Sequence, residues 1–289
     1  MKKLRFRAPH KRPRYRIQFL VRPGWRLSDG RLATLIAALR DCAGTCFDEL
    51  PAYQVMAGTR EELADKVLAI AWRKDGRIAG FCSTILLPVW GIGEVLHLGL
   101  TCVRPEDRST GLTHILTRKA VAGYLLRRRL IGKLWVSNCA AVLSSLGNVA
   151  LHFENVYPSP FAHSGPSENH IRIATAIDEL YRQKIYIAHN ATFDRDSFVF
   201  RRSVMGTCFE KDGGDQRFFH RQPQLNNYYG SLMEFDRGDE VLQVGYVSTM
   251  VAVKHLYRKK FKRPAKARRV ATLPTTPDRA VKTNFQSEE

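Results

Sequence analysis

The stretch TCVRPEDRSTGLTHILTRKAV, residues 101–121, decides the fold. It begins as the end of a β-rich run that reaches Val103, passes through Pro105, and continues from Gly111 with apolar residues at helical spacing. A helix that starts soon after a strand presents backbone N–H groups with no partner inside the helix, and Gly111 lets a ligand approach them closely. The stretch predicts a seat for phosphate or pyrophosphate; an ordinary capped helix start is the alternative.

The flanking sequence alternates between strand and helix patterns. Asp75-Gly76 separates two β-rich runs and supplies the positive φ angles of a tight hairpin turn. The predicted strands are 14–22, 67–73, 78–87, 94–103, 133–139, 185–189, 197–201 and 241–247. The predicted helices are 28–43, the quoted stretch to about 129, one that opens at 144–148, 168–182 and 248–260. This order predicts an α/β fold of the mixed α+β kind, with a central twisted mixed sheet flanked by helices.

The order of elements and the motif after the fourth strand of this core resemble the GNAT (GCN5-related N-acetyltransferase) superfamily. The family motif is Arg/Gln-x-x-Gly-x-Gly/Ala, and Arg108 and Gly111 occupy its first two fixed positions, whereas Thr113 replaces the third. The resemblance covers residues 14–160. It implies that the turn cradles the pyrophosphate of acyl-CoA and that the donor lies between splayed fourth and fifth strands.

Acyl transfer to an amine needs a base for the ammonium, an anchor for the acyl carbonyl and an acid for the leaving group. Glu94 and His97 are the titratable residues on strand 94–103, and the resemblance favours Glu94 as the base. A surface carboxylate and a core histidine are the alternatives for these two positions. Family members often carry a Tyr acid on the helix after the fifth strand, and Tyr157 lies two residues late for that role.

Other residues are expected to hold the donor. The resemblance implies that backbone N–H groups near Cys102 and Val103 bind the acyl carbonyl. Ser137 and Asn138 on the next strand are expected to face the same crevice, where Asn138 binds the acyl chain or the acceptor. Asn148, followed by Ala150, matches a pair that the family carries on the next helix. In the second half, Cys208, Glu210 and the pair Tyr228-Tyr229 are further candidates that packing explains equally well.

The positive charge is concentrated in two arms. The 289 residues carry a formal net charge of +19, and eight Lys/Arg with no acid fall in each of 1–16 and 258–269, so the remainder is nearly balanced. Such arms indicate contacts with a polyanion, nucleic acid before membrane, although solubilising tails are an alternative. The predicted nucleic-acid contacts are Arg127, Arg128, Arg129, Arg258, Lys259, Lys260, Lys262 and Arg263.

Two donors compete within this fold. Fem-type peptidyltransferases and leucyl/phenylalanyl-tRNA–protein transferases are GNAT-like proteins that accept charged tRNA, and the fungal arginine-containing cyclodipeptide synthases also use it. The basic arms and Thr113 favour aminoacyl-tRNA as the donor, with tRNA the partner, an amino acid or small amine the acceptor, and no cofactor required. The alternative is an acyl-CoA such as acetyl-CoA with a small amine or protein acceptor. A non-catalytic RNA-binding protein on a GNAT scaffold is the third hypothesis.

Composition and cysteine usage complete the expectations. The chain divides into a basic arm (1–13), a GNAT-like core (14–160), a part that completes the domain (161–263) and a disordered basic tail (264–289). No apolar run reaches the length of a membrane helix, so a cytoplasmic protein is expected. The six cysteines are dispersed and predicted to be reduced, and Cys42 and Cys46 lack the neighbours of a zinc site.

Overall fold

The computed structural model describes residues 15–128 and 132–249. Within them nine strands form a single mixed sheet in the order β1-β2-β3-β4-β5-β9-β8-β7, and β6 also pairs with β9. The strands are β1 (Arg16–Val21), β2 (Lys66–Trp72), β3 (Ile78–Val89), β4 (Gly93–Val103), β5 (Lys133–Ala140), β6 (Glu154–Tyr157), β7 (Thr192–Asp194), β8 (Val199–Arg201) and β9 (Glu240–Ser248). The helices are α1 (Pro23–Arg26), α2 (Asp29–Ala43), α3 (Leu112–Arg128), α4 (Leu143–His152), α5 (Glu168–Ala176) and α6 (Pro223–Gly230). The predicted mixed sheet with flanking helices is confirmed.

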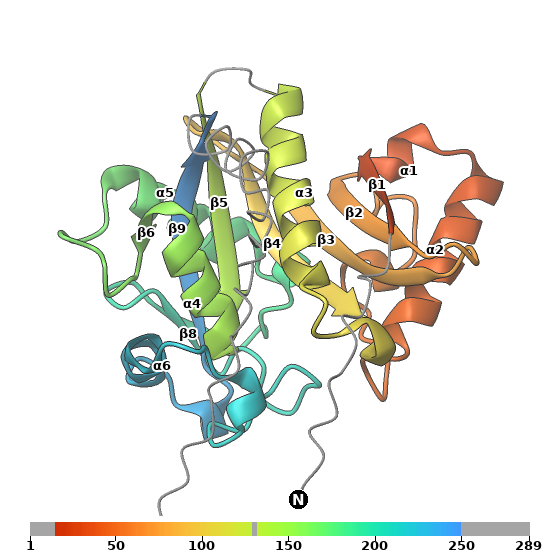
Figure 1. The fold of residues 1–289 in the computed structure, drawn as a ribbon. Coiled ribbons are helices and arrows are strands. Elements are labelled where there is room, and N and C mark those ends of the chain that lie inside the picture. Colours follow the sequence, from red (N-terminus) through yellow and green to blue (C-terminus); the bar gives the residue numbers. More distant parts are fainter. Residues whose placement is uncertain (1–14, 129–131, 250–289) are drawn as a thin grey trace, which may run out of the picture.

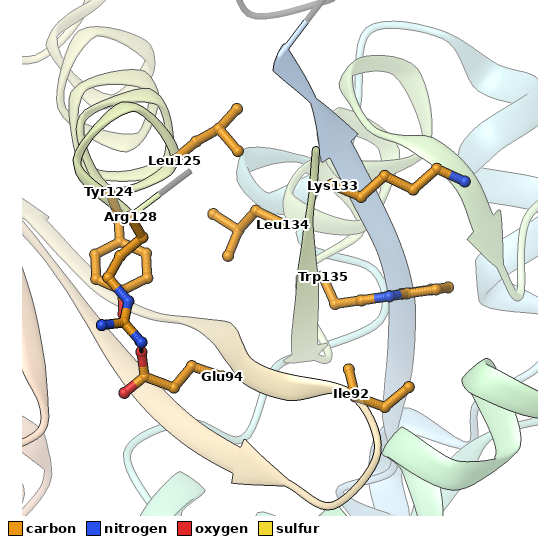
Figure 2. Close-up of a pocket in the computed structure, with 8 residues that line it drawn as sticks. All are labelled: Ile92, Glu94, Tyr124, Leu125, Arg128, Lys133, Leu134 and Trp135. Carbon is orange, nitrogen blue, oxygen red and sulfur yellow. Dashed lines mark hydrogen bonds and ion pairs between the residues drawn. The ribbon is translucent and has the colours of Figure 1, made fainter. Parts of the chain in front are cut away.

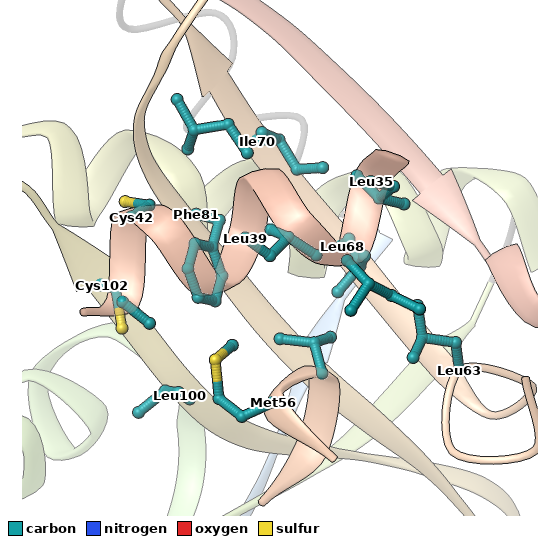
Figure 3. Packing of buried hydrophobic residues seen from close by; sticks show 14 of the residues in the cluster. Leu35, Leu39, Cys42, Met56, Leu63, Leu68, Ile70, Phe81, Leu100 and Cys102 are labelled. Carbon is teal, nitrogen blue, oxygen red and sulfur yellow. The ribbon is translucent and has the colours of Figure 1, made fainter. Parts of the chain in front are cut away.

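Strands β1 to β4 form an antiparallel meander. The β2–β3 turn is the predicted hairpin, with Gly76 at φ +84 and the Arg77 N–H donating to Asp75 Oδ1 at 3.0 Å. Helix α2 packs on this part of the sheet, because Leu35, Leu39 and other residues at helical spacing contact apolar side chains of β2, β3 and β4 (Figure 3). Burial of this apolar surface stabilises the first half of the sheet.

Helices α3 and α4 lie on the other face, and each follows one of the two central strands (Figure 1). Leu116, Ala120, Tyr124 and further residues of α3 pack against β2, β3 and β4. β4 and β5 form the one parallel pair in the described sheet, and α3 is the crossover that such a pair requires.

The part of the chain after Pro160 joins the same sheet. Strand β9 pairs with β5 along the whole length of β5, from Lys133↔Ser248 to Ala140↔Val241. The predicted strand at 185–189 is wrong: its first residue ends a 3₁₀ turn (Gln183–Ile185), and no strand of the described sheet pairs with the run. Helix 168–182 also ends earlier than predicted, in a π turn from Ile177 to Tyr181. The predicted helix 248–260 lies almost wholly outside the described residues.

Candidate functional site at the ends of the central strands

The two central strands pair over a short distance only. The β4–β5 ladder runs from Leu96↔Val136 to Leu98↔Asn138, and the strands then diverge toward their C-terminal ends (Figure 1). Each strand continues beyond the ladder, β4 to Val103 and β5 to Ala140. Crevices beyond the carboxyl ends of parallel strands are common ligand sites, and α3 and α4 both start at this edge.

A bulge in β4 lies where the ladder ends. Thr84 pairs with Leu98 and Cys82 with Thr101, so that two residues of β4 stand opposite Ser83. The extra residue reverses the alternation: Leu98 packs on the α3 side of the sheet, whereas Leu100 packs on the α2 side. The bulge thus breaks the regular edge of β4 at the point where the two central strands separate.

The turn between β4 and α3 is held open. Ser109 and Gly111 have φ values of +63 and +77, and a Cβ added at Gly111 would meet no atom within 4 Å. The backbone N–H groups of Leu112, Thr113 and His114 donate to no acceptor in residues 15–128 or 132–249. The first turn of α3 therefore presents unpartnered amides to solvent, which is the geometry of an anion seat.

Arg108 is the basic residue at this turn that has no carboxylate partner among the described residues. Arg104 pairs with Asp41, and Arg73 pairs with Asp107, whose carboxylate also accepts the Tyr15 hydroxyl at 2.7 Å. Arg108 forms no ion pair with an acidic side chain in the described part of the chain, and its Nε donates to the Val103 carbonyl at 3.3 Å.

Cys46 lies beside Arg108 and forms a hydrogen bond with Cys102. Cys46 donates its thiol to the Val103 carbonyl at 3.5 Å, the same oxygen that Arg108 binds. A hydrogen bond from Cys102 lowers the pKa of Cys46 to about 5 against the opposing effect of burial, and Arg108 adds to the lowering. The pKa of Cys102 is raised by the same bond and by burial. Cys46 is thus the more acidic thiol of the pair, and it lies next to the Arg108 guanidinium.

The expected carbonyl anchors at Cys102 and Val103 lie on the end of β4 that pairs with β3 but no longer with β5. Ser137 and Asn138 lie beside the end of the ladder, but they do not face the same crevice. Successive strand residues point to opposite faces: Ser137 Oγ lies 3.0 Å from His97 Nδ1, whereas Asn138 donates to Gln243 on β9. Burial lowers the pKa of His97 to about 3, so this side chain is neutral at neutral pH and a weak base.

Three further candidates occupy different places. Thr113 is exposed at the start of α3. Asn148 donates to the Ser144 carbonyl one turn back in α4, so its amide is tied to its own helix. Tyr157 donates its hydroxyl to the Asp196 carbonyl, and its strand β6 is separated from β4 by β9 and β5. The structure does not bring Tyr157 to the turn.

Glu94 lies at the opposite end of β4 from the anion seat. Val103 is nine positions further along the strand, or roughly 30 Å away. Figure 2 shows its carboxylate beside Tyr124 and Arg128 in a pocket lined by residues of β4, α3 and β5. Arg22 also pairs with the carboxylate. Burial acts to raise the pKa of Glu94, but the Tyr124 hydrogen bond and the two arginines outweigh it and lower the pKa. Glu94 is therefore an ion-paired carboxylate far from the turn, which corrects its expected place at the acyl group.

The predicted nucleic-acid contacts have little described structure. Arg127 and Arg128 end α3, about 25 Å along the helix from the anion seat, and Arg128 pairs with Glu94 at 2.8 Å. Arg129, the five residues at 258–263 and the N-terminal arm lie outside the described residues. Among the described residues, no group of three or more His, Cys, Asp or Glu is placed to hold a metal ion.

One acidic residue near the end of the ladder has no place among the predicted candidates. Glu240, the first residue of β9, is 8% exposed, and its carboxylate lies 3.8 Å from the Sγ of Cys139 on β5. In the sequence, the only indication of Glu240 is the pair Asp239-Glu240 directly before the apolar run VLQVGYV. An acidic residue at that position is equally typical of a strand that starts at the protein surface.

No protein-family model matches the chain, and no curated protein matches its sequence. Among solved structures, it is similar to a GNAT-family protein from Desulfovibrio desulfuricans, with 16% identity and a TM-score of 0.29 over 44% of this chain and 74% of that chain. It is also similar to a GNAT-family N-acetyltransferase from Escherichia coli in complex with CoA, with 13% identity and a TM-score of 0.29 over 52% of this chain and 73% of that chain. In this chain, the antiparallel meander, the short parallel ladder and the crossover helix are consistent with a GNAT fold.

None of the helices in the described residues has the length and apolar character needed to cross a membrane.

Proposed function

We propose that the protein is an N-acyltransferase that takes the acyl group from an acyl-CoA and transfers it to an amine. The observation that carries the proposal is the open start of α3 beside the separating ends of β4 and β5. Unpartnered amides at a helix N-terminus, with Arg108 beside them, fit a diphosphate, and the unpaired edge of β4 from Gly99 onward fits an extended arm that ends in a thioester.

The residues present fit CoA in a specific way. The amides of the first turn of α3 and Arg108 would hold the diphosphate, and Gly111 leaves room for it. When bound, CoA supplies the activated acyl group. The backbone groups of β4 beyond its bulge would orient the thioester, because they have no partner on β5 there.

Aminoacyl-tRNA is the less favoured donor. The basic residues that point to it in the sequence are outside the described residues or stand at the far end of α3 from the anion seat. An acyl-CoA needs one compact diphosphate seat, which the described residues offer.

The test of the donor is a direct comparison. Purified full-length protein is incubated with acetyl-CoA, or with total charged tRNA, and a mixture of amines, and products are read by mass spectrometry. Acetylated amines from acetyl-CoA alone support the proposal and remove the tRNA donor. Dipeptides or diketopiperazines from charged tRNA would overturn it. Salt-sensitive RNA binding with no transfer from either donor would indicate a binding protein.

The seat itself is tested by two substitutions at Gly111. Both Gly111→Ala and Gly111→Glu place a Cβ at a positive φ, so they carry the same backbone strain, but Glu alone adds a negative charge and bulk at the amides. We expect CoA binding, measured by titration calorimetry, to fall at least tenfold more in Gly111→Glu than in Gly111→Ala. Gly30→Glu, at an open position in the first turn of α2, controls for the charge change. Equal affinities in the two Gly111 variants would refute the seat.

A further inference from the structure

The carboxylate of Glu240 lies close to the point where the β4–β5 ladder ends. Cys139 is the first residue of β5 beyond the ladder, and its Sγ is 3.8 Å from Glu240 Oε2. Both side chains are on the face of the sheet that carries α5, opposite α3 and α4: Cys139 packs into the α5-side cluster, and Glu240 alternates in register with Leu242 of that cluster. If a thioester lies between the ends of β4 and β5 that are not paired with each other, Cys139 lies between the thioester and Glu240.

The two oxygens of this carboxylate have different surroundings. Ser203 donates its hydroxyl to Oε2 at 2.6 Å, and the Cys139 thiol also points to Oε2. Oε1 accepts no hydrogen bond from residues 15–128 or 132–249. Since every fully buried side-chain polar atom there has a partner, Oε1 is reached by solvent. One oxygen thus has two hydrogen-bond partners, and the other has none in the described residues.

No cation within 4 Å neutralises Glu240 in the described part of the chain. The groups that face it are Cys139 from β5, Ser203 and Lys211 from the segment before β9, and Tyr53 from the segment after α2. Lys211 donates to the carbonyls of Cys208 and Glu210 at 3.0 Å each, which ties it to its own loop. Burial raises the pKa of Glu240 to about 7, against the opposing effects of Ser203, Cys139 and Lys211.

We propose that Glu240 is the catalytic residue that receives the acceptor amine: its free oxygen binds the acceptor's ammonium and takes one proton from it. The assignment rests on the proposed acyltransferase function and deepens it. The unprotonated nitrogen then forms the N–C bond with the acyl carbon. The C–S bond breaks, its electron pair leaves on the CoA sulfur, and the sulfur takes up the second proton, which the nitrogen loses as the amide forms. Glu240 returns its proton to water.

The surroundings of Glu240 suit this role. A buried carboxylate that lacks an ion pair favours a cationic partner that arrives with the substrate. A group that titrates near the working pH is the most effective proton acceptor. The Ser203 bond keeps the carboxylate in one orientation, as required for a base that must meet a nitrogen beside the end of the ladder.

The test compares two small acceptors in the full-length protein with acetyl-CoA as the donor. Methylamine is protonated at pH 7 and needs a base, whereas methoxyamine, of similar size, is already unprotonated. We expect Glu240→Gln to lower kcat/KM for methylamine at least 100-fold and to change that for methoxyamine less than threefold. CoA binding, measured by calorimetry, should be unchanged. The matched control is Glu154→Gln. This substitution on β6 removes a carboxylate that accepts the N–H of Ser248, which lies on β9 like Glu240.

The wild type supplies a second readout that does not depend on any variant folding. The profile of kcat/KM for methylamine should fall on the acid side of a pKa near 7, and that for methoxyamine should lack this limb. Equal losses for both amines in Glu240→Gln, or an acid limb shared by both, would overturn the role of Glu240 while the acyltransferase function stands. A wild type that binds no CoA, or that acylates neither amine, would overturn the proposed function and this assignment together.

Discussion

The burial of Glu240 predicts how the stability of the protein depends on pH. A carboxyl whose folded-state pKa lies above its ordinary value of 4.5 binds more protons in the folded state than in the unfolded state between pH 4.5 and about 7. Folding is therefore progressively destabilised as the pH rises through this window. At 1.36 kcal/mol for each pH unit, a pKa of about 7 corresponds to about 3 kcal/mol once Glu240 is fully ionised.

The substitution Glu240→Gln isolates this effect. Glutamine has the same shape and its oxygen can still accept the Ser203 hydroxyl, but it does not ionise. The free energy of unfolding of the variant minus that of the wild type should thus rise by about 3 kcal/mol between pH 4 and pH 8. Any constant effect of the substitution shifts the whole curve and leaves this rise intact.

The assay is urea unfolding of both proteins, followed by far-UV circular dichroism at five pH values from 4 to 8. The rise must exceed the one measured for Glu154→Gln, which controls for the loss of a carboxylate bonded to β9. A flat difference would show that solvent or Lys211 stabilises the charged form of Glu240. A fall with pH would show that the carboxylate has an ionic partner, and either result would refute the argument from burial.

Three further outcomes follow from the residues around the turn and at the far end of β4. Alkylation of Cys46 by iodoacetamide, followed by peptide mass spectrometry, should show a pKa near 5 that Arg108→Ala raises, because a positive charge is lost. Asp107→Asn should lower the free energy of unfolding by about 2–4 kcal/mol in urea, because the buried carboxylate holds Arg73 and Tyr15. Glu94→Gln should leave acyl transfer to methylamine within twofold of wild type, because Glu94 lies at the opposite edge of the sheet.

The first half of the fold could be predicted because its signals are local. The apolar runs of β2, β3 and β4, the Asp75-Gly76 turn, and helical spacing in α2 and α3 each appear within a few consecutive residues. The run at 185–189 shows why local signals fail later. Ile185 and Ile187 are buried in the α5-side cluster, so their alternation is real, but no strand pairs with that run in the described sheet. The short elements β6, β7 and α6 carry too few residues to produce a pattern.

The candidate site divides in the same way. The open turn before α3 could be predicted, since Arg108, Gly111 and the end of β4 are neighbours in the sequence. The separate roles of Ser137 and Asn138 follow from the alternation of a strand, yet their partners depend on which strands lie on either side. The contact between Cys139 and Glu240 joins residues about a hundred positions apart, and no spacing rule reveals it.

Topology explains why one glutamate at a strand start is a candidate base and the other is not. Glu94 is the second residue of β4, and Glu240 is the first residue of β9. β4 runs parallel to β5, so its start lies at the edge of the sheet where β5 also starts, with the ends of both strands and the beginning of α3 at the other edge. β9 runs antiparallel to β5, and Ala140 pairs with Val241, so the start of β9 lies beside the end of β5. Two acidic residues in equivalent local contexts are therefore placed at opposite edges, and only Glu240 shares an edge with the anion seat.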